Sequence, residues 1–167
     1  MGRLLTNATM AELKIPHRDI LSLNLEPIKI LVQSILLDNA LADHEQKFQL
    51  IIDFPRESND PRELSEIPEV RLWFVRLDAV FPWFPFLLDW KSGELGRYAA
   101  MLVPHQFHRT EGIQYNPEAL EIFVMGKVFC LSEVLPEFDI QPQSRVKAIA
   151  QLLGYDLDDE FLNSITA

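Results

Sequence analysis

One block of the chain, residues 60–105, concentrates the residues that most restrict how the chain can fold. It contains all three tryptophans, four of the eleven phenylalanines and five of the prolines. Aromatic side chains bury large areas and dominate cores and interfaces alike. The block therefore predicts either the centre of one hydrophobic core, or a core that keeps part of its apolar surface free for a partner.

Length and composition predict a single globular domain over residues 1–167, with residues 1–18 loosely ordered. Of the 167 residues, 48% are hydrophobic and 24% are charged, which is enough apolar material to bury a sizeable core. Proline and glycine are dispersed along the chain, and no repeat or low-complexity tract marks a linker. Nothing in the sequence therefore divides the chain.

The charge balance restricts the class of partner. The chain has 25 acidic and 15 basic residues, for a net charge of −10. The electrostatic field of this negative charge repels polyanions, so it disfavours nucleic acid and anionic lipid as partners. It favours a basic protein surface, although an acidic balance is also a common means of keeping a protein soluble.

The N-terminal residues and the single cysteine predict a cytoplasmic protein. Residues 1–19 lack the apolar stretch of a secretory signal, and no run of apolar residues is long enough to span a membrane. Because Cys130 is the only cysteine, the chain cannot form an internal disulfide or a site built on several of its own thiolates. Its apolar neighbours on an expected helix predict a buried, unreactive thiol, and we expect no cofactor.

The hydrophobic pattern predicts an α+β fold, with a small mixed sheet of three or four strands covered by five or six helices. An α/β sandwich is the alternative. Alternation of period two predicts a strand at 20–25, and residues 47–54 are typical of a largely buried strand. A short apolar run predicts a third strand at 84–88, and residues 105–115 are expected to form a loop with a short strand at 113–115. Apolar stripes and capping signals predict helices at 27–42, at 66–81, from a Ser92 cap to Pro104, at 117–135, at 144–153 and at 158–165.

The usual catalytic and phosphate-binding motifs are absent from the sequence, including GxGxxG, GxxxxGK[ST], HExxH, GxSxG and CxxC. One acid/base set remains as an alternative, because its members flank a single expected strand–helix unit: Asp89, Glu94, Arg97 and His105. Glu94 and Arg97 also have a purely structural interpretation, as a helix-start acid paired with a base one turn on.

A weaker pattern resembles a metal site. His105 and His108 are separated by two residues, with Glu111 nearby, and the two imidazoles could share an ion if the loop curled. No third ligand precedes them in the sequence, so solvated or capping histidines are the simpler interpretation. We expect no metal.

Arginine together with tryptophan and tyrosine is the composition of interface hot spots. The aromatic block combines these residue types, so it predicts a partner-binding surface. Its candidate members are Arg71, Trp73, Trp83, Trp90, Arg97, Tyr98 and His105.

Three long strings carry a family resemblance: PRELSEIPEVRLWFVRLDAVFPWFPFLLDWKSGELGRYAAMLVPHQ, YNPEALEIFVMGKVF and RVKAIAQLLGYDLDDEF. Over about residues 60–162 the chain resembles the chlororespiratory reduction six family of cyanobacteria and chloroplasts. The resemblance implies a soluble assembly factor for the photosynthetic NAD(P)H dehydrogenase-like complex. It would act on the ferredoxin-like iron–sulfur subunit, in the stroma or the cyanobacterial cytoplasm, and it carries over no catalytic residue.

The cysteine count limits how such a factor could act. A client with two four-iron clusters needs eight thiolates, whereas this chain has one cysteine and cannot hold such a cluster in the usual way. Three roles follow: a client-specific chaperone that covers a client face with its aromatic and arginine side chains, a small enzyme using the acid/base set, and a permanent subunit of the complex.

Overall fold

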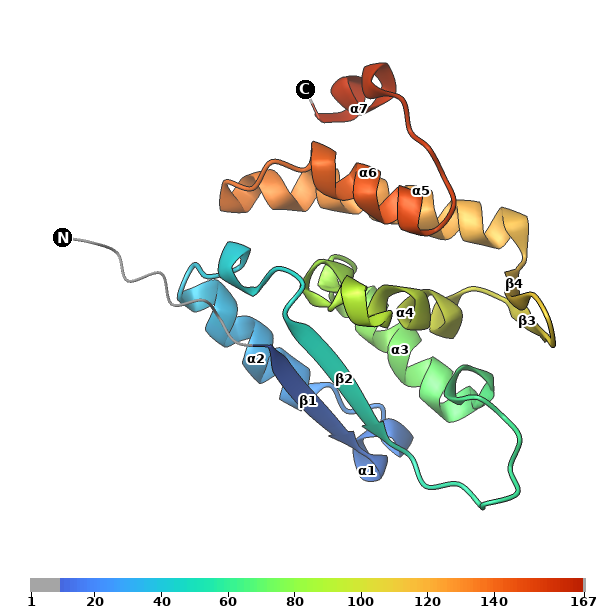
Figure 1. Ribbon diagram of the computed structural model, residues 1–167. Coiled ribbons are helices and arrows are strands. Elements are labelled where there is room, and N and C mark those ends of the chain that lie inside the picture. The colour runs from blue at the N-terminus through green and yellow to red at the C-terminus, as the bar shows by residue number, and fades with distance from the viewer. Residues whose placement is uncertain (1–9, 167) are drawn as a thin grey trace.

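The computed structural model describes residues 10–166 (Figure 1). This part of the chain contains seven α-helices and four strands, which confirms the predicted α+β class. The strands form two separate two-stranded sheets instead of one mixed sheet. The predicted loose order of residues 1–9 lies outside the described residues, whereas residues 11–18 form a strand and the start of a helix.

The N-terminal part is a parallel strand pair with a helical crossover. Strand β1 (Ala11–Pro16) pairs with β2 (Phe48–Asp53), and α1 (His17–Leu21) and α2 (Glu26–Leu37) connect them. Parallel strands need such a connection because the chain leaves the first strand at one end of the sheet and must enter the second strand at the opposite end. One face of the sheet packs into the core through alternate residues, of which Ile15, Phe48 and Leu50 are fully buried.

The predicted strand at 20–25 is wrong, and the first strand lies earlier. Residues 20–25 form the end of α1 and a turn in which Leu23 adopts a positive φ of 53°. Leu21 is exposed whereas Leu25 is buried, so the alternating leucines of this segment do not share one buried face. Helix α2 also ends earlier than predicted, at Leu37, because Asn39 takes a left-handed conformation with φ 50°.

The aromatic block forms the centre of the molecule. Helix α3 (Pro68–Val80) and helix α4 (Glu94–Leu102) begin and end close to the predicted positions. Helix α4 starts after Gly93, whose φ is 88°, and not at a Ser92 cap. The buried side chains of the two helices share one core and include Val70, Trp73, Phe74, Leu77, Leu95 and Tyr98.

The predicted strand at 84–88 is a short 3₁₀ helix, Phe84–Leu87. Pro85 removes an amide from this segment, so the segment cannot extend the ladder. Only Leu88 pairs as a strand residue, in an isolated parallel bridge with Phe48. The 3₁₀ helices of the described residues are η1 (Ala42–His44), η2 (Leu64–Glu66), η3 (Phe84–Leu87), η4 (Trp90–Ser92) and η5 (Leu135–Phe138).

Three helices form the C-terminal layer, above α3 and α4 in Figure 1. They are α5 (Pro117–Val134), α6 (Gln143–Leu152) and α7 (Asp159–Thr166), all close to their predicted limits. Asn116 caps α5 by accepting a hydrogen bond from the Ala119 amide at 3.0 Å. Gly154 follows α6 with a φ of 93°, as a left-handed glycine cap requires. No helix among residues 10–166 combines the length and apolar character needed to cross a membrane.

A buried ion pair joins the C-terminal layer to the rest of the core. Lys127 of α5 forms a salt bridge with Asp78 of α3 and donates to the Pro82 carbonyl at 3.0 Å. The Tyr98 hydroxyl donates to the same Asp78 carboxylate at 2.8 Å. Burial, with the nearby carboxylate, holds the pKa of Tyr98 well above its ordinary value, so the phenol stays a donor. Helices α3, α4 and α5 therefore meet at one polar cluster.

Removing the Lys127 ammonium should strongly destabilise the fold, because it leaves the Asp78 carboxylate largely buried and short of a partner. We expect Lys127→Met to lower the free energy of unfolding by about 2–3 kcal/mol. Urea denaturation measures this change. The D78N/K127M double variant should recover part of the loss, whereas Lys91→Met, which removes an exposed ammonium, should change little. Equal stabilities for K127M and K91M would contradict this role.

Candidate partner-binding surface

A groove of about 440 Å³ lies between η2, α4 and the segment that follows α4. Gly93, which precedes α4, and Gly96 and Ala100 of α4 form one wall, so the surface there is close to the backbone. Two arginines, Arg56 and Arg97, also line the groove. Its other lining residues are Glu63, Leu64, Ser65, Met101, Phe107, Ile113 and Tyr115. We call this feature the hairpin groove.

The second sheet supplies the apolar side of the hairpin groove. Residues 105–115, expected as a loop, form an antiparallel hairpin of β3 (His105–His108) and β4 (Gly112–Tyr115). Phe107 and Ile113 lie opposite each other in its register, and their side chains are 42% and 39% exposed. The hairpin thus presents a pair of apolar side chains beside the groove, with solvent access.

Hydrogen bonds fix the hairpin to the body of the protein. The Nδ1 of His105 bonds the Val103 carbonyl at 2.9 Å, so this nitrogen carries the proton and Nε2 accepts from the Ser65 hydroxyl at 3.1 Å. The Tyr115 hydroxyl donates to the Gly96 carbonyl at 3.1 Å, and burial raises the pKa of this phenol. The position of the groove's apolar edge is therefore set by contacts with α4 and η2.

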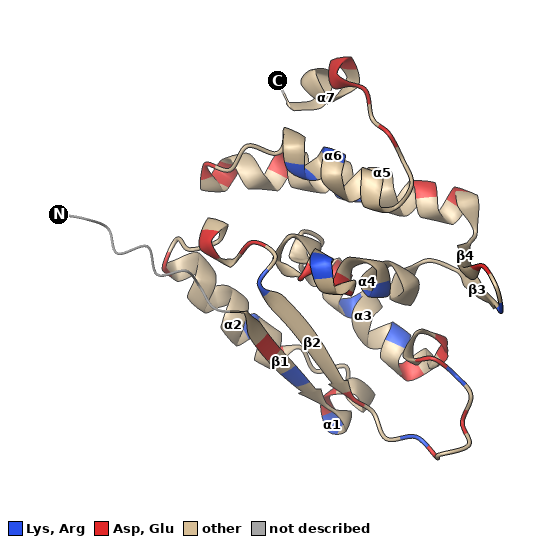
Figure 2. Cartoon of the chain, viewed as in Figure 1, with Lys and Arg blue, Asp and Glu red and all other residues tan. Residues whose placement is uncertain are grey.

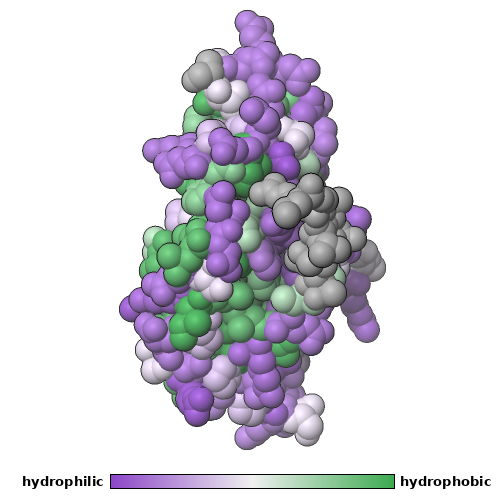
Figure 3. Space-filling model, turned by 90° about the vertical axis from the view of Figure 1, so that its left-hand side faces the viewer, coloured by the Kyte–Doolittle hydropathy of each residue, from purple (hydrophilic) through white to green (hydrophobic). Residues whose placement is uncertain are grey.

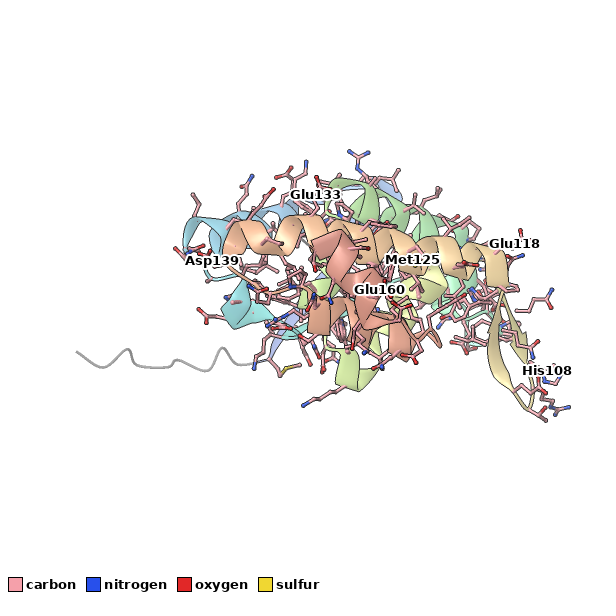
Figure 4. All side chains as sticks on the ribbon, turned by 90° about the horizontal axis from the view of Figure 1, so that it is seen from above. His108, Glu118, Met125, Glu133, Asp139 and Glu160 are labelled. Carbon is pink, nitrogen blue, oxygen red and sulfur yellow. The ribbon has the colours of Figure 1, made fainter. Side chains whose placement is uncertain are left out.

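The hairpin also decides the metal hypothesis for His105 and His108. Residues three apart on a strand point to opposite faces, so these two rings cannot share an ion. Figure 4 shows His108 at the far end of the hairpin, beyond the N-terminal end of α5 where Glu118 lies. Both ring nitrogens of His105 are already hydrogen-bonded. In the part of the chain that the structure describes, no group of three or more His, Cys, Asp or Glu side chains could hold a metal ion.

Two members of the predicted acid/base set complete the edge of a sheet. The Glu94 carboxylate accepts from the Leu50 amide at 3.4 Å, and Arg97 donates to the Leu50 carbonyl at 2.8 Å. The two side chains also pair with each other at 3.4 Å. They thereby take the place that a third strand would occupy beside β2. Burial raises the pKa of Glu94, against the opposing effects of Arg97 and the Leu50 amide.

The other two members have structural contacts of their own. Asp89 caps η4 by accepting from the Lys91 amide at 3.1 Å and the Ser92 amide at 3.4 Å. His105 is held by the two hydrogen bonds described above. Of the four residues proposed for catalysis, only Arg97 lines the hairpin groove. Asp89 lines a different pocket, beside Met10 and Lys91.

The seven predicted partner-binding residues are divided between core and surface. Trp73, Trp90 and Tyr98 are buried, and the indole nitrogens of the two tryptophans donate to backbone carbonyls. While the fold is intact, these three side chains belong to the core. Arg71 and Trp83 are half-buried, as are two residues at or beside the hairpin groove, Arg97 and His105.

Phe107 and Ile113 are not among the residues predicted from the sequence to bind a partner. They belong to the short tracts HQFH and GIQY, in which apolar and polar residues alternate, and the second tract begins with Gly112. Such alternation beside a glycine is the signal of a hairpin. Four residues are too few to show this pattern clearly, and the spacing of the two histidines resembles a metal site instead.

Charged and apolar side chains are unevenly distributed over the surface of the molecule. From residue 117 to the end, the chain has nine acidic and three basic residues, and Figure 2 shows this acidic character along α5, α7 and their connections. Figure 3 shows the side on which α2 lies, with apolar side chains gathered in the middle of the face and hydrophilic ones above and below them. Ile30 and Leu37 of α2 are 65% and 86% exposed.

Cys130 is half-buried on α5, and burial raises the pKa of its thiol. Since the thiolate is the reactive form, we expect the folded protein at neutral pH to react with a thiol reagent several-fold more slowly than the urea-unfolded chain. Absorbance of the released chromophore measures both rates. A faster reaction in the folded state would reveal an activated thiol and contradict this expectation.

The raised pKa of Glu94 predicts a pH dependence of stability. The folded state holds this proton more tightly than the unfolded chain, whose pKa is near 4.5. Lowering the pH from neutral towards 4.5 should therefore raise the free energy of unfolding of the wild type relative to that of Glu94→Gln. The added stability should be lost again as the pH rises through the pKa of Glu94 in the folded state. Urea titrations of both proteins test this, and a stability difference independent of pH would contradict it.

Comparison with known proteins gives one family. The family model described as chlororespiratory reduction 6 matches residues 15–164, nearly the whole chain. No solved structure matches the protein. The match extends the sequence resemblance from about residue 60 back through β2 and the crossover helices to the last two residues of β1. The chain belongs to the chlororespiratory reduction 6 family.

Proposed function

We propose that this protein is a non-catalytic assembly factor for the photosynthetic NAD(P)H dehydrogenase-like complex. In this proposal it binds the ferredoxin-like iron–sulfur subunit before that subunit enters the complex, in the cytoplasm of a cyanobacterium or the stroma of a chloroplast. Membership of the chlororespiratory reduction 6 family supports the link to this complex. The identity of the client comes from the sequence resemblance alone.

The observation that carries a binding role is the hairpin groove. Its edge exposes an aromatic and a branched aliphatic side chain, Phe107 and Ile113, beside a wall of small residues. Apolar anchors that insert into a pocket, surrounded by polar residues and arginine, are the usual centre of a protein interface. The neighbouring ionisable groups are committed to backbone contacts, which supports binding over acid/base chemistry at this place.

The client would be recognised through its protein surface. The chain has one cysteine, and the pKa of that thiol is raised, so it is a poor ligand for iron at neutral pH. A four-iron cluster normally takes four thiolates. The factor would therefore cover a face of the client and leave the cluster ligands to the client's own cysteines.

Removing the two apolar anchors should weaken client binding. We expect the F107S/I113S variant to bind the purified iron–sulfur subunit about thirtyfold more weakly than the wild type, since central interface residues typically contribute about 2 kcal/mol. Biolayer interferometry with immobilised client measures the affinity. The matched control is I30S/L37S, which removes two exposed apolar side chains from α2 and should bind like the wild type.

Circular dichroism and thermal unfolding must first show that both variants are folded. Unchanged binding by F107S/I113S would place the contact elsewhere and contradict the groove as the client site. Failure of the wild-type protein to bind the client would contradict the proposed function itself. Copurification of the chain with the finished complex would instead identify a permanent subunit.

A further inference from the structure

The outer edge of β1 is open in the described part of the chain. In the parallel pair, the Ala11 amide donates to the Lys47 carbonyl at 2.7 Å, so the residues that alternate with Ala11 turn their backbone groups away from β2. These residues are Glu12 and Lys14. Neither has a backbone hydrogen-bond partner within residues 10–166, and β1 has no second neighbour in its sheet. An edge of this kind is a template for another strand.

The charges on this edge are complementary to themselves. Glu12 and Lys14 are exposed, and the Lys14 side chain is 69% exposed with a 3.5 Å ion pair to Asp53. If β1 pairs antiparallel with β1 of a second copy about Leu13, then Glu12 lies opposite Lys14 of the second copy, and the reverse. Moving the two-fold axis by one residue in either direction, which slides the pairing by two residues, places Glu12 opposite Glu12 or Lys14 opposite Lys14. Only the first register brings opposite charges together.

The same register suits the rest of the strand. It places Pro16, which has no amide hydrogen, opposite Met10 at the end of the ladder, where a missing donor costs least. On the inner face it brings together the half-buried Leu13 side chains of the two copies. It also turns a sheet of two strands, a small unit by itself, into one of four.

We propose that β1 is a self-association edge, through which two copies of this chain form a symmetric dimer with a continuous four-stranded sheet. This inference does not rest on the proposed function, because the client site is the hairpin groove and none of the residues lining that groove belongs to β1. The interface is small and polar, so the dimer forms at high chain concentration and dissociates on dilution.

Charge reversal tests the proposal with matched variants. We expect the wild type to show a concentration-dependent monomer–dimer equilibrium in analytical ultracentrifugation. E12K and K14E should each dimerise about tenfold or more weakly, since each places like charges opposite one another. The E12K/K14E double variant restores the complementary pairs and should dimerise like the wild type. An equimolar mixture of E12K and K14E should form a heterodimer for the same reason.

Three results would overturn the proposal. The first is a wild type that stays monomeric up to millimolar concentration. The second is a dimer that both single variants form with wild-type affinity, because its interface would then lie elsewhere. The third is slow hydrogen exchange of the Glu12 and Lys14 amides in dilute, monomeric protein, which would show that another segment of the same chain covers the edge. Exchange that slows only as the dimer forms supports the pairing.

Discussion

The ammonium group of Lys127 ties the C-terminal layer to the core helices. It lies buried on a helix whose other buried residues are apolar except for Ser132, and it is shared between the Asp78 carboxylate and the Pro82 carbonyl. A buried charge without such partners is strongly unfavourable, so the position of α5 relative to α3 is set by this contact as well as by packing. Tyr98 adds α4 to the same cluster, which brings the wall of the hairpin groove under the same constraint.

The sequence predicted those elements whose signals are local. Helices α3 and α5 combine a proline near the first turn, a strong apolar stripe and a following proline, and their observed limits lie within a few residues of the expected ones. The strand at 48–53 is rich in apolar residues and was also predicted. The first strand was missed because it pairs with a strand beyond a helical crossover, and such a non-local pairing leaves little local signal. The alternation in residues 20–25 was taken for a strand instead. The 84–88 segment was assigned to a strand from its composition, although Pro85 prevents a full ladder there.

The candidate site was predictable only in part, because burial is a tertiary property. A list of arginine and aromatic residues cannot distinguish Trp73, which donates to the Asn24 carbonyl inside the core, from Trp83, which remains half-buried. Arg97 and His105, predicted as partner-binding residues, lie at or beside the groove, and their observed contacts are structural. Phe107 and Ile113 have weak local signals and become notable only when the hairpin places them side by side.

The side-chain edge beside β2 has a consequence for synthesis on the ribosome. The Leu50 amide and carbonyl find their partners on Glu94 and Arg97, which follow 44 and 47 residues later. A nascent chain that has emerged only through β2 therefore holds both parallel strands and their connecting helices, yet it leaves two backbone groups of an inward-facing strand residue without partners. The parallel unit gains its final stability only when α4 has left the exit tunnel, so the N-terminal half is expected to wait for the middle of the chain instead of folding first.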